Sequence, residues 1–396
     1  MANSLKKIRH LLISICRIVI LYISTLIPRN KKILLFGAWW GNKYDDNPRY
    51  LFEYAVKKRK DIKSYWITPS KTIYDSLRKK NLPVCYSYSI KAIWLTLRAR
   101  NMVVCTARAD IGSNLMMFTG GMRQVSLWHG VPLKKIMYDD NFAQSRKLSI
   151  TNRILNKIEH FPKREYVVFC TSDYYHKIYQ SAFRLPASHV LNLGQARNDY
   201  FYSEHDNPLR YRFDNKKIIL YMPTHRREGK QKMDMSKLLN LYAINEECEK
   251  NNAVFLIKKH YYHANESVTA IENFCNILDI TREISSSQVL LDACDMLITD
   301  YSSCFIDHLL LNRPQIFYAY DLEDYLANDR EMYCDYIPNA PGRICTSTDE
   351  LCEEIAKLLA GHDEYTAKRT QQLEHYYSKE NQCVVSPKQI DAILSL

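Results

Sequence analysis

The chain has 396 residues, enough for two domains of ordinary size that each bury a core. With 46% hydrophobic and 25% charged residues, and only 10 Gly and 13 Pro, its composition excludes extensive disorder. The formal net charge of +12 indicates an anionic partner, which the charge alone leaves open among nucleic acid, anionic lipid and a phosphorylated substrate.

The N-terminal segment, residues 1–30, has basic residues around an apolar run from Leu11 to Ile27 that Arg17 interrupts. As a helix this run is about 25 Å long, slightly short of the ~30 Å hydrocarbon core of a bilayer. A signal peptide is disfavoured because no small-residue cleavage site is present. We expect a membrane-associated helix lying in the lipid interface, and the alternative is a helix packed on its own domain.

After residue 30, short apolar strands alternate with amphipathic helices, the pattern of an α/β architecture. The predicted strands of the first half are 32–37, 64–68, 101–106, 124–129 and 166–171. Those of the second half are 216–223, 253–260, 295–300 and 314–320.

Residues 200–215 are polar and lack periodicity, so we place a domain boundary there. The predicted domains are 31–205 and 206–396. Both are expected to be doubly wound and Rossmann-like, facing a cleft at the carboxyl ends of their strands.

The strongest motif runs from Asp295 to Tyr325. In it a strand ends at Asp300, the turn "YSS" follows, and a helix begins at once. Ser302 or Ser303 is expected in the N-cap region, where helix N–H groups favour an anion. Ordinary helix capping explains the same serines equally well.

Two further strand ends carry basic residues. His260 follows "LIKK" and is suited to hold a phosphate, although a structural or solvated histidine is the commoner case. "YMPTHRR" offers Thr224 and Arg226, whose paired donors suit phosphate oxygens, and a solvated loop is the alternative.

In the first half, "FGAWWGNKYDDNPRYL" lacks the G-x-G-x-x-G dinucleotide fingerprint. Asp46 and Asn47 precede Pro48 and are expected at a helix start, either as capping residues or as substrate contacts.

His129 in "SLWHGVPLKKI" ends a predicted strand, and Gly130 leaves room for a substrate. A neutral imidazole there is suited to deprotonate a hydroxyl, and a core histidine is the alternative. Lys134 is a candidate contact for acceptor phosphates or the membrane, with simple solvation as the alternative.

Together these stretches resemble the CDP-glycerol glycerophosphotransferase family, whose members build teichoic acids and some capsule polymers. The resemblance covers almost everything after residue 32 and is carried by "FGAWWGNKYDDNPRYL", "LWHGVPLKKI", "CTSDYY", "GQARND", "YMPTHR", "LIKKH", "LITDYSSCFIDHLLLNRPQIFYAYDLEDY" and "APGRI".

The resemblance implies a GT-B-like fold, peripheral attachment to the cytoplasmic face of the cell membrane, and transfer of glycerol phosphate from CDP-glycerol to a lipid-linked or polymer acceptor with release of CMP. By that similarity 31–205 is the acceptor-side domain and 206–396 the donor-binding domain, and His129 and His260 are the catalytic residues. His129 is the base, His260 with Ser302 and Ser303 holds the donor diphosphate, and Asp300 orients their loop.

The nearest alternative is a transferase of the same architecture that uses CDP-ribitol or another activated alditol or sugar. A non-catalytic membrane-surface or nucleic-acid binding protein is a second alternative. No nucleic-acid recognition motif is visible, so no nucleic acid is expected as a partner. The histidines and cysteines show no zinc-ligand spacing, so neither a metal nor a cofactor is expected beyond the donor substrate.

Overall fold

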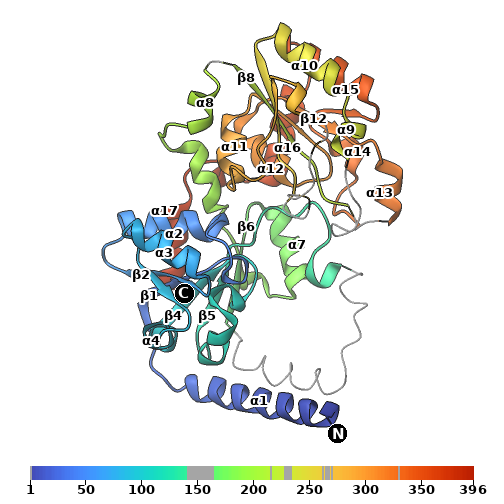
Figure 1. Ribbon diagram of the computed structural model, residues 1–396. Coiled ribbons are helices and arrows are strands. Elements are labelled where there is room, and N and C mark those ends of the chain that lie inside the picture. Colours follow the sequence, from blue (N-terminus) through green and yellow to red (C-terminus); the bar gives the residue numbers. More distant parts are fainter. Residues whose placement is uncertain are drawn as a thin grey trace. The chain divides into compact units, whose positions relative to one another are not determined.

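The computed structural model describes residues 2–140, 165–214, 216–226, 234–260, 263, 268, 271–328 and 331–396. The chain forms two compact units. The first contains residues 1–129, 143–199 and 383–396, and the second contains residues 130–142 and 200–382. Each unit is built around one parallel β-sheet (Figure 1).

The sheet of the first unit has seven strands in the order β3-β2-β1-β4-β5-β6-β7. The strands are β1 (Asn30–Phe36), β2 (Lys63–Thr68), β3 (Val84–Tyr86), β4 (Ala99–Val104), β5 (Arg123–Ser126), β6 (Tyr166–Cys170) and β7 (Val190–Asn192).

Both faces of this sheet are buried, which explains the unbroken apolar run in β1. Leu34 and Phe36 point into one core cluster, whereas Ile33 and Leu35 point into the cluster on the opposite face. Alternate side chains of a strand face opposite sides, so a strand covered on both faces has to be apolar at every position.

The helices of the first unit are α1 (Ala2–Ser24), α2 (Asp46–Lys58), α3 (Lys71–Lys79), α4 (Ile90–Arg98), α7 (Asp173–Phe183) and α17 (Ser386–Ser395). Helices α2, α3, α4, α7 and α17 pack on the sheet, whereas α1 contacts the 3₁₀ segment Ser113–Phe118. Phe52 of α2 and Ile390 of α17 belong to one core cluster, and Leu95 of α4 belongs to the other.

The C-terminal helix α17 returns to the first unit and packs against α2 (Figure 1). Gln389 donates hydrogen bonds to the carbonyls of Leu193 and Gly194, and Asp199 accepts from the backbone N–H groups of Val385 and Ser386. The observed units therefore differ from the predicted domains in three respects. They divide at 199/200, a few residues before the predicted boundary, and residues 130–142 belong to the second unit. Residues 383–396 belong to the first unit, because α17 completes its core.

The sheet of the second unit has six strands in the order β10-β9-β8-β11-β12-β13. The strands are β8 (Lys217–Met222), β9 (Ala253–Ile257), β10 (Ile277–Asp279), β11 (Met296–Thr299), β12 (Gln315–Tyr318) and β13 (Arg343–Cys345). Its helices are α8 (Pro208–Arg212), α9 (Met235–Leu238), α10 (Leu241–Lys250), α11 (Ser287–Ala293), α12 (Cys304–His308), α13 (Leu322–Asn328), α14 (Tyr336–Asn339), α15 (Thr348–Leu359) and α16 (Thr366–Tyr376).

Helix α1 is held to the first unit at its C-terminal end. Leu21 and Ser24 are buried, and the Ser24 hydroxyl accepts a hydrogen bond from the N–H of Gly120 at 2.9 Å. Arg29, just beyond the helix, donates to the carbonyl oxygens of Ser24 and Phe118.

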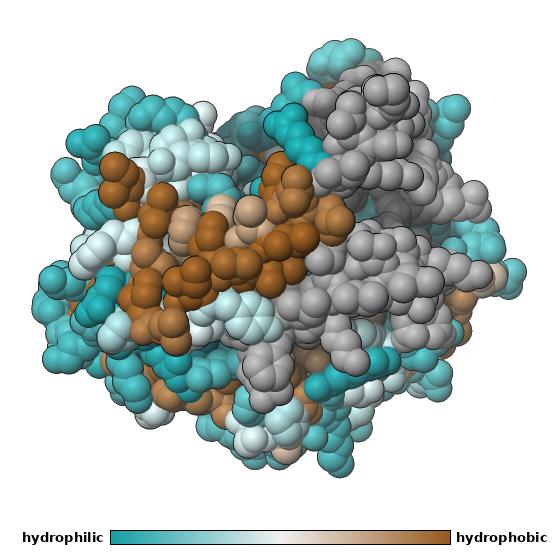
Figure 2. Space-filling view, turned by 90° about the horizontal axis from the view of Figure 1, so that it is seen from below, coloured by the Kyte–Doolittle hydropathy of each residue, from teal (hydrophilic) through white to brown (hydrophobic). Residues whose placement is uncertain are grey.

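The rest of α1 and the turn after it leave a large apolar surface uncovered by the described residues. The exposed apolar residues are Leu11, Leu12, Ile13, Ile15, Val19, Ile23 and Leu26. Figure 2 looks onto this side of the protein and shows a continuous hydrophobic band. Of the helices that the structure describes, none is both long and apolar enough to cross a membrane.

Candidate functional site

The residues predicted to act in a site fall into two groups, one in each unit. Asp46, Asn47 and His129 belong to the first unit. The second unit contains the remaining ones, which are Gly130, Lys134, Thr224, Arg226, His260, Asp300, Ser302 and Ser303.

His129 lies in a short irregular segment after β5, not on the strand itself, which ends at Ser126. The preceding Trp128 has a φ of 53° and the following Gly130 a φ of 137°. A bulky residue at positive φ is strained and needs support from its surroundings, and such residues are common at functional sites.

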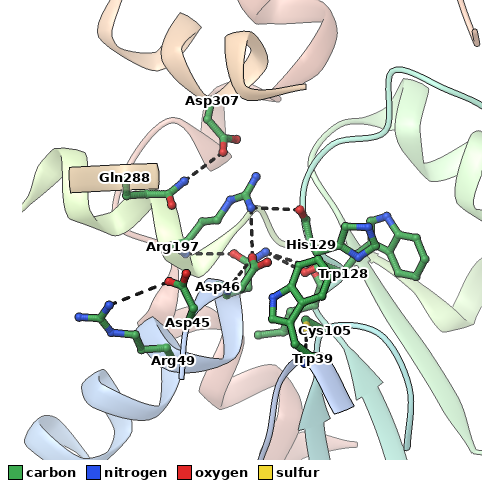
Figure 3. A network of polar contacts seen from close by, with 12 residues as sticks. Trp39, Asp45, Asp46, Arg49, Cys105, Trp128, His129, Arg197, Gln288 and Asp307 are labelled. Carbon is green, nitrogen blue, oxygen red and sulfur yellow. Dashed lines mark hydrogen bonds and ion pairs between the residues drawn. The ribbon is translucent and has the colours of Figure 1, made fainter. Parts of the chain in front are cut away.

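Asn47 and Arg197 provide that support by binding consecutive carbonyl groups of the segment, and Figure 3 shows the bond from Arg197 to His129. The fully buried Asn47 amide donates to the carbonyls of Trp128 at 2.9 Å and Leu127 at 3.4 Å, and its oxygen accepts from the N–H of Arg197 at 3.0 Å. Arg197 Nη1 donates to the carbonyl of His129 at 3.0 Å. These bonds therefore fix the backbone from Leu127, just after β5, to His129.

Asp46 completes this group as the counter-ion of Arg197, with 3.1 Å between Nη1 and Oδ1. Both side chains are largely buried, so removing either one would leave a buried charge without its partner. Asp46 Oδ1 also accepts from the N–H of Asn47 at 2.9 Å, at the start of α2. Arg197 belongs to the motif "GQARND", which was the available signal, but no role was predicted for it from the sequence.

The His129 imidazole lies between two tryptophan rings, with centroid distances of 4.3 Å to Trp128 and 5.2 Å to Trp39 (Figure 3). Burial lowers the pKa of His129 below its ordinary value of 6.5; the Asp46 carboxylate acts in the opposite direction, and Arg197 lowers the pKa further. The ring is therefore neutral at pH 7, the state that a base requires.

The His129 imidazole is held by a hydrogen bond to the backbone of Cys105, and its Nδ1 is buried with no hydrogen-bond partner among the described residues. A neutral imidazole keeps a lone pair on one of its two ring nitrogens, and that nitrogen can take the proton of a hydroxyl.

Asp110, which the sequence analysis did not single out, organises the loops beside His129. Its fully buried carboxylate accepts from the N–H groups of Trp40 at 2.8 Å, Cys105 at 3.0 Å and Thr106 at 2.8 Å. Trp39 and Trp40 also have positive φ, at 51° and 55°. Asp110 thus fixes both the strained Trp39–Trp40 turn and the Cys105 backbone that orients the imidazole.

In the second unit, Arg226 is almost fully buried and bound to protein groups. Nε and Nη2 donate to the two oxygens of Asp321 at 2.6 and 3.0 Å, and Nη1 lies 2.9 Å from Asp300 Oδ2 and donates to the Thr224 carbonyl at 2.7 Å. The guanidinium also lies within 5.4 Å of the ring centroids of Tyr301, Tyr320 and Tyr325. These contacts favour a positioning role for Arg226 over the predicted direct contact with a phosphate.

Asp300 links the two loops of this group. Its Oδ1 accepts from the N–H groups of Thr224 at 2.8 Å and Tyr301 at 2.6 Å. The Thr224 hydroxyl is buried and has no hydrogen-bond partner among the described residues, so it is available to a ligand. The predicted role of Asp300 in orienting the "YSS" loop is consistent with these bonds.

Ser302 and Ser303 lie at the predicted helix start, half-buried, but the helix is short. Helix α12 has only five residues, Cys304–His308, and a 3₁₀ turn, Leu309–Leu311, continues it. The N-cap residue Ser303 makes no side-chain capping bond, and the Ser302 hydroxyl accepts weakly from the N–H of Cys304 at 3.4 Å. His260 is half-buried and packs against His225, with ring centroids 4.3 Å apart.

Gly130 and Lys134 lie in the segment that joins the second unit directly after His129. The φ of Gly130 is one that only glycine adopts without strain. Lys134 Nζ lies 4.9 Å from the ring centroid of Tyr325. No group of three or more His, Cys, Asp or Glu side chains in the described part of the chain is arranged to hold a metal ion.

Comparison with known proteins gives concordant matches. A family model described as CDP-glycerol:poly(glycerophosphate) glycerophosphotransferase matches residues 20–386. The teichoic acid poly(glycerol phosphate) polymerase of Bacillus spizizenii is 30% identical over 89% of this chain and 90% of its own length. The teichoic acid glycerol-phosphate transferase of Staphylococcus aureus is 28% identical over 86% of this chain and 87% of its own length.

Among solved structures, the wall teichoic acid polymerase TagF matches 100% of this chain and 98% of its own with a TM-score of 0.75 and 23% identity. This likeness confirms the predicted fold class, two parallel-sheet α/β domains of the GT-B-like kind.

Proposed function

Because the chain belongs to the CDP-glycerol:poly(glycerophosphate) glycerophosphotransferase family, we propose that it transfers glycerol phosphate from CDP-glycerol to a hydroxyl of a polymer acceptor in teichoic acid or capsule polymer synthesis. The family match confirms the predicted family and enzyme class. The observation that carries the mechanism is a neutral His129 held on a strained segment by Asn47 and Arg197.

In the proposed reaction, the neutral imidazole of His129 removes the proton from the acceptor hydroxyl. The oxygen attacks the β-phosphorus of CDP-glycerol, and the bond to the bridging oxygen breaks, so that CMP leaves. Positioning of the base and neutralisation of the pyrophosphate are the two contributions that the protein has to make. The first is supported by the fixed backbone around His129.

For the second contribution we propose that Thr224, His260, Ser302 and Ser303 contact the donor diphosphate. The unpartnered Thr224 hydroxyl and the unused Ser303 side chain at the start of α12 support this assignment. Arg226 and Asp300 position the loops that carry these groups, through the bonds that join Thr224 to Tyr301.

We also propose that the acceptor is lipid-linked and that the enzyme works at the cytoplasmic face of the cell membrane. The exposed apolar surface of α1, together with a net charge of +12, supports a helix that lies in the interface of an anionic bilayer.

The test of the function is CMP release by the purified chain with a glycerol-phosphate acceptor and either CDP-glycerol or CDP-ribitol. We expect turnover with CDP-glycerol that requires the acceptor and persists in EDTA, since no metal cofactor is expected. Turnover with CDP-ribitol alone would assign the donor to the alternative, and no turnover with either would reject a transferase of this class.

A further inference from the structure

A pocket of about 590 Å³ lies at the free edge of the first unit's sheet, away from the residues described above. Its lining comes from β2, α3, the loop between α3 and β3, β3 and the start of α4, and it includes Tyr65, Tyr74, Arg78, Asn81, Tyr86 and Lys91. Its volume is within the range of small-molecule sites. Four strand spacings separate β3 from β5, the strand before His129, which is about 19 Å across the sheet.

The lining combines half-buried tyrosines with exposed cations and contains no acidic residue. Arg78 lies 5.8 Å from the ring centroid of Tyr74, to whose hydroxyl it donates, and Lys91 Nζ lies 5.3 Å from the ring centroid of Tyr65. Lys91 and Arg78 make no ion pair among the described residues, so their charges are available to an anion.

The tyrosines continue beyond the pocket as a row of neighbouring rings. Tyr74 and Tyr86 have centroids 5.9 Å apart, and Tyr86 and Tyr88 have centroids 5.4 Å apart. Tyr88 is 62% exposed. A row that leaves the pocket onto the surface fits a ligand with repeating units better than a single small molecule.

This chemistry selects for an anionic polyol. Guanidinium and ammonium groups bind phosphate oxygens, tyrosine rings offer flat surfaces to a carbon backbone, and tyrosine and asparagine polar groups exchange hydrogen bonds with hydroxyls. A purely apolar ligand would leave the cations unused, and a neutral sugar would leave their charge uncompensated.

We infer that the pocket and the Tyr74–Tyr86–Tyr88 row form a second binding site, which holds glycerol phosphate units of the acceptor polymer at a distance from the reacting end. The identity of the ligand rests on the proposed function, whereas the site itself rests on the pocket and its charges. Such a site retains a growing chain between successive additions, because two linked contacts raise the effective concentration of the reacting end.

The test is calorimetric binding of a soluble glycerol phosphate oligomer to the full chain without CDP-glycerol. Two double variants are compared, Arg78→Gln with Lys91→Gln in the pocket, and Lys57→Gln with Lys58→Gln on the exposed face of α2 as the control. Both remove the same charge from exposed side chains, and the thermal midpoint of each confirms that it is folded.

We expect the pocket variant to bind the oligomer on the order of tenfold more weakly, from the loss of two charge-assisted contacts, and the control to bind like the wild type. Equal weakening in both variants, or none in the pocket variant, would overturn the inference. Because no donor is present, the result does not depend on whether CDP-glycerol is the true donor.

A third arm uses phosphatidylglycerol vesicles, whose headgroup presents the same glycerol phosphate chemistry. Loss of vesicle binding in the pocket variant with unchanged oligomer affinity would assign the pocket to the lipid headgroup and overturn the polymer site. Loss of oligomer affinity with unchanged vesicle binding is the result that we expect.

Discussion

Replacing Asn47 with alanine tests directly whether the backbone around His129 is held for catalysis. The substitution removes the donors to the carbonyls of Trp128 and Leu127 and the acceptor for the N–H of Arg197. Trp128, at a φ of 53°, then loses the side chain that holds it in a strained conformation. We expect the segment to relax and to carry the imidazole away from its working position.

The magnitude follows from the bonds lost. Three hydrogen bonds, each with a net contribution of about 1 kcal/mol, lower the free energy of unfolding by about 3 kcal/mol. A displacement of about 1 Å of a catalytic group lowers kcat by about 100-fold. If Asn47→Ala only destabilised the protein, activity would fall in proportion to the fraction of protein that is unfolded. We expect kcat to fall by more than that fraction.

The matched control is Asn101→Ala in β4, because Asn101 is also fully buried in the first unit. Its amide donates to the carbonyl of Ile393 in α17 at 3.2 Å. Urea unfolding and CMP release are measured for both variants. We expect Asn101→Ala to lose about 1 kcal/mol of stability with wild-type kcat. A folded Asn47→Ala protein with wild-type kcat would refute the positioning role.

Three further predictions concern other parts of the chain. Burial lowers the pKa of His308 to about 3, so the unfolded chain binds more protons than the folded one below about pH 6.5, and the free energy of unfolding falls with acid. Between about pH 7.5 and about pH 5.5 this residue alone lowers the free energy of unfolding by about 1.4 kcal/mol. The urea midpoint of His308→Gln should therefore depend less on pH than that of the wild type. Arg226→Lys loses the paired bonds to Asp321 and should lower the free energy of unfolding by about 3 kcal/mol; a protein as stable as the wild type would show that the pair does not hold the loops. Leu12→Asp with Val19→Asp on the exposed face of α1 should abolish cosedimentation with anionic vesicles while CMP release with a soluble acceptor persists, and unchanged cosedimentation would contradict an interfacial α1.

The sequence predicted the central strands of both sheets and missed four others, β3, β7, β10 and β13. Each has only three residues, and these four form the two edges of each sheet. Central strands are covered on both faces and read as apolar runs, whereas a short edge strand buries little and gives no such run. The apolar runs therefore predicted the central strands of each sheet but not the edge strands, so they did not predict the number of strands in each sheet.

The candidate site was predictable where a residue follows a strand and unpredictable where a partner comes from elsewhere in the chain. His129 and Asp300 were found because each follows an apolar run. Arg197 and Asp321 were not singled out, because their roles depend on residues far away in the chain. Arg197 contacts residues about 70 and 150 positions away, and Asp321 contacts one about 95 positions away. Arg226 shows the same limit, because its type suggested a phosphate contact while its buried partners are carboxylates.

The proposal that His129 is the base is tested most directly by the rate of CMP release from CDP-glycerol in His129→Ala, measured against pH with a saturating acceptor. The account predicts that the wild-type rate falls in acid with an apparent pKa below 6.5, because burial depresses the pKa of His129, and that the folded variant loses at least about 100-fold in kcat together with this acid limb. A folded His129→Ala protein that retains the wild-type rate and the same pH dependence would contradict it.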